Sequence, residues 1–284
     1  KTIIVGSLRG LFGHNIHTTF KEIMIKNPHK TLTAVSLLEE ITCNPQELDC
    51  LMGLSHCDEC AQLGEEMKAN FLEICECLGI TEIYYDQWLS TDYSAIHSLC
   101  DPAEIFANNF VDAIKKLKEH HFLSMKQEKN YKEELENLPL GHLLIEMDFA
   151  ENYVFKTQDS IQHNYFINRQ ATIHPCVIHT SPTETKCVVF ISPALEHTAA
   201  EVSLFIKRLH SDIISRDYPN TKFISFWSDG APTQYKNLKH FNEIGQHETK
   251  YNIPISWSMS AAGHGKGKIN KTLEIFFSSD LFLV

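Results

Sequence analysis

The order of strands and helices predicted after Gly141 is the feature that most limits how this chain folds. The apolar residues there recur with the period of strands, interrupted by helical stretches. We predict strands over residues 142–149, 170–179, 186–192, 222–229 and 255–261. Helices are predicted over residues 198–216 and 234–249 and after the glycine-rich turn 263–267. The order is therefore three strands, a helix, a strand, a helix, a strand and a helix.

This order predicts an α/β fold. Three successive strands can form a meander, and a helix can then cross over to a strand that runs parallel to its neighbour. The ribonuclease H-like fold, a mixed sheet with flanking helices, has this order. We place such a core in residues 140–284 and expect it to be truncated at its C-terminal end.

The residues before the core have a different pattern. Leu63, Met67 and Phe71 fit one face of a helix, and a second helical stretch runs from Pro102 to about Leu138. We therefore predict a mainly helical region over residues 63–139. Residues 1–62 combine short helical pieces with a cluster of cysteines, and we treat them as a separate module.

Charge and composition limit the partners of the chain. The 25 basic and 36 acidic residues give a net charge of −11, which disfavours a wide nucleic-acid-binding surface unless basic residues gather on one face. No apolar run reaches the roughly 18–20 residues of a membrane span, so no membrane partner is expected. We find no signal peptide pattern, and because the chain begins at Lys1 we expect it to be a fragment. Protein partners and an oligomer are possible, and most of the 16 histidines are expected at the surface.

Four cysteines lie close together near the start of the chain. Cys43, Cys50, Cys57 and Cys60 have the spacing C-x6-C-x6-C-x2-C, and two residues between thiolates let one turn present both sulfurs to one ion. Four such ligands predict a structural Zn²⁺ site in a reducing, intracellular protein. The alternative is a set of buried free thiols.

Two aspartates end predicted core strands. Asp148 follows one apolar strand and Asp229 follows another, and we expect these strands to be parallel neighbours with both carboxylates at the same edge. Two close carboxylates repel each other until a cation lies between them, and hard oxygen ligands suit Mg²⁺ or Mn²⁺. Two such ions support phosphodiester chemistry. The alternative is that each aspartate merely caps the segment that follows it.

The segment GHGKGKIN, residues 263–270, is where we look for a third metal-binding residue and for lysines that contact DNA. Asn270 lies there, and Glu274 follows one helical turn later on the same face. Lys266 and Lys268 lie beside glycines, so this loop could contact a DNA phosphate backbone. An ordinary solvated loop is the alternative.

Three blocks of the sequence resemble a family of transposase-derived proteins found in animal genomes. DFAENY at 148–153, followed by QDSIQ at 158–162, resembles the DFAENY…QDEIQ block of that family. SDGAPTQYKN at 228–237 resembles its SDG…QYKN block, and GHGKG at 263–267 resembles its GHGKG block. The three blocks have the family's order and cover about residues 140–270.

The resemblance implies a ribonuclease H-like DDE/D transposase core that acts on DNA in the nucleus. Under it, Asp148 and Asp229 are the first two metal-binding acids, and His264 is a catalytic candidate within its block. The family carries a comparable cysteine block before its core. In the family, an aspartate and then glycines follow GHGKG, whereas Asn270 stands in that place here, which leaves Glu274 as the candidate third ligand.

We therefore predict a transposase-derived, DNA-acting protein whose two-metal site is degenerate. The alternative is a non-catalytic nucleic-acid- or protein-binding protein co-opted from a transposase. The first two acids favour the enzyme, and the acidic charge and Asn270 favour the binding protein.

Overall fold

The computed structural model describes residues 2–4, 42–44, 50, 57–90, 94–155 and 170–260. The chain divides into two compact units, residues 1–125 and residues 126–284. The long helix α5 (Ala103–Glu136) contributes residues to both units. Within the described ranges, no helix is long and apolar enough to cross a membrane.

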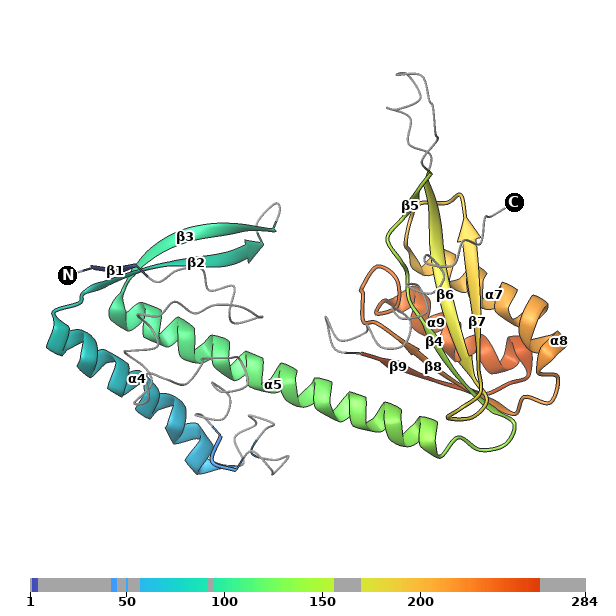
Figure 1. Ribbon diagram of the computed structural model, residues 1–284, viewed down its shortest axis with the longest axis horizontal. Coiled ribbons are helices and arrows are strands. Elements are labelled where there is room, and N and C mark those ends of the chain that lie inside the picture. The colour runs from blue at the N-terminus through green and yellow to red at the C-terminus, as the bar shows by residue number, and fades with distance from the viewer. Residues whose placement is uncertain are drawn as a thin grey trace, which may run out of the picture. The chain divides into compact units, whose positions relative to one another are not determined.

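The first unit contains helices α4 and α5 and a three-stranded sheet (Figure 1). Its elements before α5 are β1 (Thr2–Ile4), α4 (Asp58–Leu78), β2 (Glu82–Ser90) and β3 (Ser94–Pro102). Strand β2 pairs parallel with β1 and antiparallel with β3. Phe71, Phe106 and Phe110 lie among the buried side chains that join α4 to α5.

The hairpin β2–β3 lies between the two helices of the region predicted to be mainly helical, residues 63–139, and was not itself predicted. Ile83 and Tyr85 are buried, whereas the residue before each of them, Glu82 and Tyr84, is exposed. This alternation has the period of a strand, and β-branched and aromatic residues favour strands. Helix α4 ends before it, at Gly79, whose φ of 65° is a left-handed conformation that favours glycine.

The second unit contains a six-stranded mixed sheet. Its strands are β4 (His142–Met147), β5 (Tyr153–Val154), β6 (Gln170–His179), β7 (Thr185–Ser192), β8 (Phe223–Ser228) and β9 (Ile255–Met259). Along the sheet the order is β7, β6, β4, β8 and β9, and β5 pairs with the start of β6. Strands β4, β8 and β9 are parallel to one another, and β6 is antiparallel to β4 and β7. The mixed α/β class and the five main strands are confirmed.

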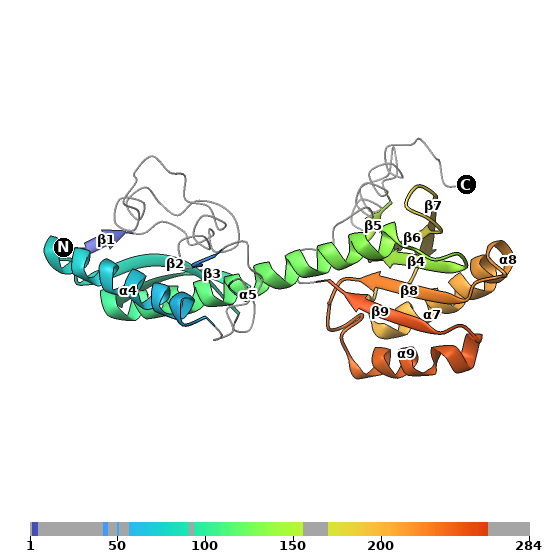
Figure 2. The same ribbon diagram turned by 90° about the horizontal axis from the view of Figure 1, so that it is seen from below.

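Helices cover both faces of this sheet (Figure 2). On one face, α7 (Ala199–Arg208) and α9 (Leu238–Tyr251) pack with buried strand residues such as Ile145 and Phe226. On the other face, the last turns of α5 contribute Leu135, which packs with Leu144 and Trp227. Both sides of the parallel strands are therefore buried, which explains why β4 and β8 read as continuous apolar runs.

The helix predicted over residues 198–216 contains a π-helical turn. After α7, Leu209–Ile214 is a π-helix, and α8 (Ser215–Asp217) completes the segment. A π-turn adds one residue to the turn, so the residues after it change their facing. Ile214 is consequently 2% exposed, whereas Ile213, which the α-helical period placed in the core, is only partly buried.

Candidate functional site

The four predicted zinc ligands converge in the first unit. Cys43 Sγ lies 3.4 Å from Cys50 Sγ, 3.2 Å from Cys57 Sγ and 3.4 Å from Cys60 Sγ. All four sulfurs lie within 4.8 Å of one another, and none forms a disulfide. Sulfurs around one tetrahedral Zn²⁺ at about 2.3 Å would be about 3.8 Å apart. The cluster therefore has the donor set and the dimensions to hold a metal ion such as zinc.

The surroundings favour negative charge on the sulfur of Cys60, whereas hydrogen bonds with the neighbouring thiols raise the pKa of Cys43. Cys57 is the N-cap residue of α4 and Cys60 lies in its first turn, where the helix dipole stabilises a thiolate. Burial would raise the pKa of Cys60, but the Cys43 amide, the neighbouring thiols and the charge of Lys118 together lower it. Lys118 is itself only 4% exposed, so its ammonium can offset the charge of a thiolate cluster.

The strands that carry the two aspartates are parallel neighbours, as predicted. In the β4–β8 ladder Glu146 pairs with Trp227, and the residues two positions further along the two strands are Asp148 and Asp229. Both aspartates are half-buried and follow the last residue of their strand. The shared register therefore brings the two carboxylates to the same edge of the sheet.

Local hydrogen bonds fix each aspartate. Asp148 Oδ1 accepts from the amide of Phe149 at 2.8 Å, and Asp229 Oδ1 accepts from the amide of Ala231 at 3.2 Å. Burial raises the pKa of Asp229, and the hydrogen bond from the Ala231 amide partly offsets this rise. A side chain at Gly230 would lie 3.2 Å from the Ser260 carbonyl oxygen, so glycine lets the chain after β8 approach the chain after β9.

Tyr235 lies close enough to both aspartates to feel their charges. It is completely buried, and its hydroxyl lies 3.1 Å from His174 Nε2 on β6. Burial raises its pKa far above the usual value, and the charges of Asp148 and Asp229 raise it further. Tyr235 thus remains a neutral phenol close to both carboxylates.

The residues around Asp148 form a second fixed group. The Phe149 ring lies edge-on to His174 at 4.6 Å and stacks on His197 at 4.4 Å. Asn152 Oδ1 lies 2.9 Å from His197 Nε2 and accepts from the Thr172 hydroxyl at 3.0 Å. These contacts give the DFAEN residues a structural role in holding the chain after Asp148.

A buried acid, Glu146, lies on the face of the sheet that α5 covers. Glu146 Oε1 accepts a hydrogen bond from the Tyr131 hydroxyl and lies 2.8 Å from His179 Nε2. Glu146 is 7% exposed and His179 is fully buried, so this acid joins α5 to the sheet and does not face solvent. An acid inside an apolar strand was the only sequence signal for this group.

Several histidines are buried, although most of the 16 were expected at the surface. Among the described residues of this unit, the buried ones are His174, His179, His210, His240 and His247. Two of them lie within the continuous apolar run of β6, where a polar residue needs a partner. The remaining three come from the helices and had no signal in the apolar pattern.

Several predicted site residues lie outside the described residues. They are His264, Lys266, Lys268, Asn270 and Glu274, and the interpretation of each stays a prediction. Among the described residues, the four cysteines form the one group in which three or more histidine, cysteine or carboxylate ligands converge.

Comparisons with known proteins place the second unit in a family. Residues 127–271 match a family described as a domain of unknown function (DUF8701), and the chain belongs to this family. Residues 13–118 match a second domain of unknown function (DUF8700). None of the curated proteins matches the chain.

A solved structure shares weak similarity with the chain. It is the crystal structure of the N. crassa QDE-2 AGO MID-PIWI domains, which is 13% identical over 96% of this chain and 80% of that chain. The TM-score is 0.22, a value that does not indicate a common fold.

Proposed function

We propose that the second unit is a ribonuclease H-like core derived from a DDE/D transposase, and that Asp148 and Asp229 hold a divalent cation in it. The observation that carries this proposal is the register of β4 and β8, which brings both acids to one edge of the sheet. The strand order, with an antiparallel meander β7–β6–β4 followed by parallel β8 and β9, supports it. Two of the sequence blocks that resemble the transposase-derived family begin at this edge, with Asp148 and Ser228. The third block, GHGKG at 263–267, lies outside the described residues.

The donor set at this edge fits Mg²⁺ or Mn²⁺. Both residues offer carboxylate oxygens, which hard cations prefer, and both are half-buried at the end of a strand. A bound cation would supply Lewis-acid activation of a water or a 3′-hydroxyl in phosphodiester chemistry. Asp148 and Asp229 would orient it, while Tyr235 and the Phe149 contacts hold the two acids in place.

The cysteine cluster would take Zn²⁺ in a structural role. Its four thiols would complete a tetrahedron and leave no position open for a substrate. The cluster ties the segment around Cys43 to the start of α4. We therefore assign it to the folding of the first unit and not to the chemistry of the second.

The third acid decides whether the core is active. Asn270 occupies the place where the resembling family has an aspartate, and an amide is a neutral and weaker ligand for Mg²⁺. Glu274 is the remaining candidate. We propose a degenerate core that binds the cation weakly, and a DNA-binding or protein-binding role in the nucleus is the second candidate function, favoured by Asn270 and the net charge of −11.

The experiment compares metal-dependent nicking of DNA by the parent chain, Asn270→Asp and Glu274→Ala, with Asp229→Asn as the inactive control. A degenerate core predicts no activity in the parent and a gain in Asn270→Asp. Activity in the parent that Glu274→Ala abolishes would identify a relocated third ligand. Activity that persists in Asp229→Asn would refute the assignment of the acid pair, and inactivity of the parent and all three variants would favour the binding protein.

A further inference from the structure

Two buried histidines of the second unit face each other through the same ring atom. His210 Nε2 and His247 Nε2 are 2.9 Å apart. His210 is 4% exposed and His247 is 3% exposed. His247 Nδ1 lies 3.0 Å from the Ile253 carbonyl oxygen and donates its hydrogen to it. That bond leaves a lone pair on His247 Nε2, directed toward His210. Metal-binding histidines usually have a carbonyl partner of this kind at their other nitrogen.

The backbone that presents His210 is unusual. His210 belongs to the π-helix Leu209–Ile214, and isolated π-turns inside helices are rare and occur frequently at functional sites. The Tyr251 ring stacks on His210 at 4.0 Å with an interplanar angle of 7°, and it lies 4.8 Å from the His247 ring. Both imidazoles are therefore held on fixed elements with their Nε2 atoms together.

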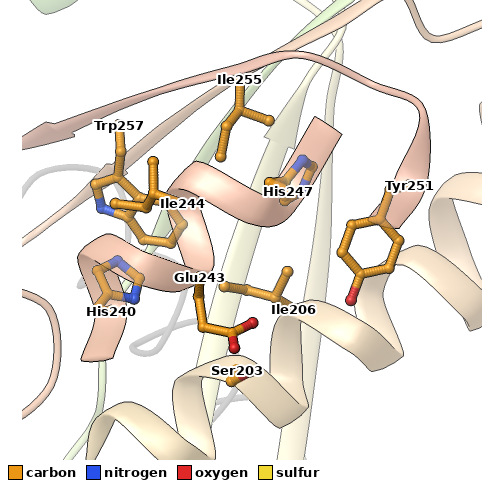
Figure 3. A pocket seen from close by; sticks show the side chains of 9 residues that line it. All are labelled: Ser203, Ile206, His240, Glu243, Ile244, His247, Tyr251, Ile255 and Trp257. Carbon is orange, nitrogen blue, oxygen red and sulfur yellow. The ribbon is translucent and has the colours of Figure 1, made fainter. Parts of the chain in front are cut away.

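A pocket with unsatisfied polar groups adjoins this pair (Figure 3). It lies between α7, α9 and β9, and His247 and Tyr251 line it. Glu243 extends into it from α9 toward Ser203, one helical turn before His247. His240 also lines it, is 1% exposed, and has no hydrogen-bond partner for either ring nitrogen among the described residues. Buried polar groups without a protein partner commonly mark the place of an ion or a water.

The separation of the two nitrogens agrees with a particular coordination geometry. Nitrogens that are both about 2.05 Å from one ion lie about 2.9 Å apart at a right angle and about 3.4 Å apart at a tetrahedral angle. The observed 2.9 Å is the length of an N–H···N hydrogen bond, and it is also compatible with adjacent positions of a square-planar or octahedral ion. Ni²⁺ and Cu²⁺ have these geometries and bind imidazole strongly.

We propose that His210 and His247 form a second metal site, distinct from the cysteine cluster and from the aspartate pair, that takes a divalent ion of the Ni²⁺ or Cu²⁺ type. Glu243 would become the third ligand: it lies four residues before His247 on the same helix face, although its carboxylate does not converge with the two imidazoles among the described residues. Its carboxylate now accepts from Lys250 at 2.7 Å, and it would turn from this partner to the ion. Because Lys250 is partly exposed, its ammonium can return to water.

One hydrogen has to move before both nitrogens can bind an ion. Because His247 donates from Nδ1 to the Ile253 carbonyl, the hydrogen between the two Nε2 atoms belongs to His210, and it would shift to His210 Nδ1 when the ion binds. The competing interpretation is a hydrogen-bonded histidine pair that shares one proton and binds no ion.

The test is a Ni²⁺ titration of the full chain after the cysteines have been loaded with Zn²⁺. Nickel is preferred because Cu²⁺ oxidises thiols. We expect one Ni²⁺ per chain, and an affinity that falls at least about tenfold in His210→Gln and in His247→Gln. His142→Gln, which removes a half-buried imidazole at the start of β4, is the matched control and should bind as the parent does. Glu243→Gln should weaken binding without abolishing it.

A measurement on the parent keeps the proposal testable if a glutamine variant fails to fold. X-ray absorption at the nickel edge should show scattering from two imidazoles and no sulfur. Binding of Ni²⁺ that both histidine variants retain, a sulfur shell around nickel, or a parent chain that binds no Ni²⁺ would overturn the proposal. The last result would leave His210 and His247 as a hydrogen-bonded pair.

Discussion

The buried His174 gives the second unit a defined sensitivity to acid. His174 is fully buried, and burial lowers its pKa from 6.5 to about 3. Below pH 6.5 the unfolded chain takes up a proton that the folded chain excludes. Stability is therefore complete above about pH 6.5 and is lost as the pH falls toward 3. Each pH unit in this window lowers the free energy of unfolding by about 1.4 kcal/mol per histidine. A change from pH 7 to pH 5 covers about 1.5 units of the window, so His174 alone lowers the free energy of unfolding by about 2 kcal/mol.

The assay is urea unfolding at pH 7 and pH 5, followed by the fluorescence of Trp227 and Trp257 in a Trp88→Phe background. The matched variant is His174→Gln, whose amide oxygen can accept the Tyr235 hydroxyl but does not titrate. The other buried histidines titrate in both proteins and cancel in the comparison. We expect the variant to be less stable at pH 7 but to lose about 2 kcal/mol less between the two pH values. An equal loss in both proteins would show that His174 is protonated in the folded state.

Three other perturbations test the zinc cluster, the core and a glycine turn. A strong zinc chelator should unfold the first unit, as followed by circular dichroism, while Cys50→Ser should weaken the zinc response; an unchanged spectrum would refute a structural ion. Phe226→Ala removes a fully buried ring and should cost about 3–5 kcal/mol in urea unfolding, and a cost below 1 kcal/mol would contradict its central place. Gly141→Ala places an L-residue at a backbone φ of 83° and its Cβ atom 3.4 Å from the Asn220 carbonyl oxygen. The melting temperature should therefore fall by an amount equivalent to about 1–2 kcal/mol. No fall in melting temperature would refute this reading of the turn.

The sheet of the second unit could be predicted because its strands are buried on both faces. The apolar runs of β4 and β8 identified them directly, and the aspartates that end them stood out against their neighbours. The order of elements is shared by several folds, and in the ribonuclease H-like topology that it suggested these two strands are parallel neighbours. The same reasoning could not reveal the π-turn after α7, because a one-residue insertion leaves the composition of a helix unchanged.

The parts that were missed depend on contacts between distant segments. In the hairpin β2–β3, polar and charged residues surround the buried Ile83 and Tyr85. The alternation of buried and exposed residues therefore extends over too few positions to distinguish a strand from a helix in the sequence. The histidines of α9 and the π-turn are buried only because they meet each other or an aromatic ring. Side-chain partners of this kind are set by tertiary packing and have no local signature. The zinc cluster was the exception, because four ligands within 18 residues define the site by spacing alone.

The central claim is that Asp148 and Asp229 jointly hold a divalent cation, and Mn²⁺ binding followed by electron paramagnetic resonance tests it most directly. The titration compares the parent chain with Asp148→Asn, Asp229→Asn and Asn270→Asp. The account predicts weak binding of Mn²⁺ by the parent, loss of that binding in either Asp→Asn variant, and tighter binding in Asn270→Asp, because hard cations are held mainly by charged oxygens. Mn²⁺ binding that neither Asp→Asn variant changes would contradict the account, as would a parent and an Asn270→Asp variant that both bind none.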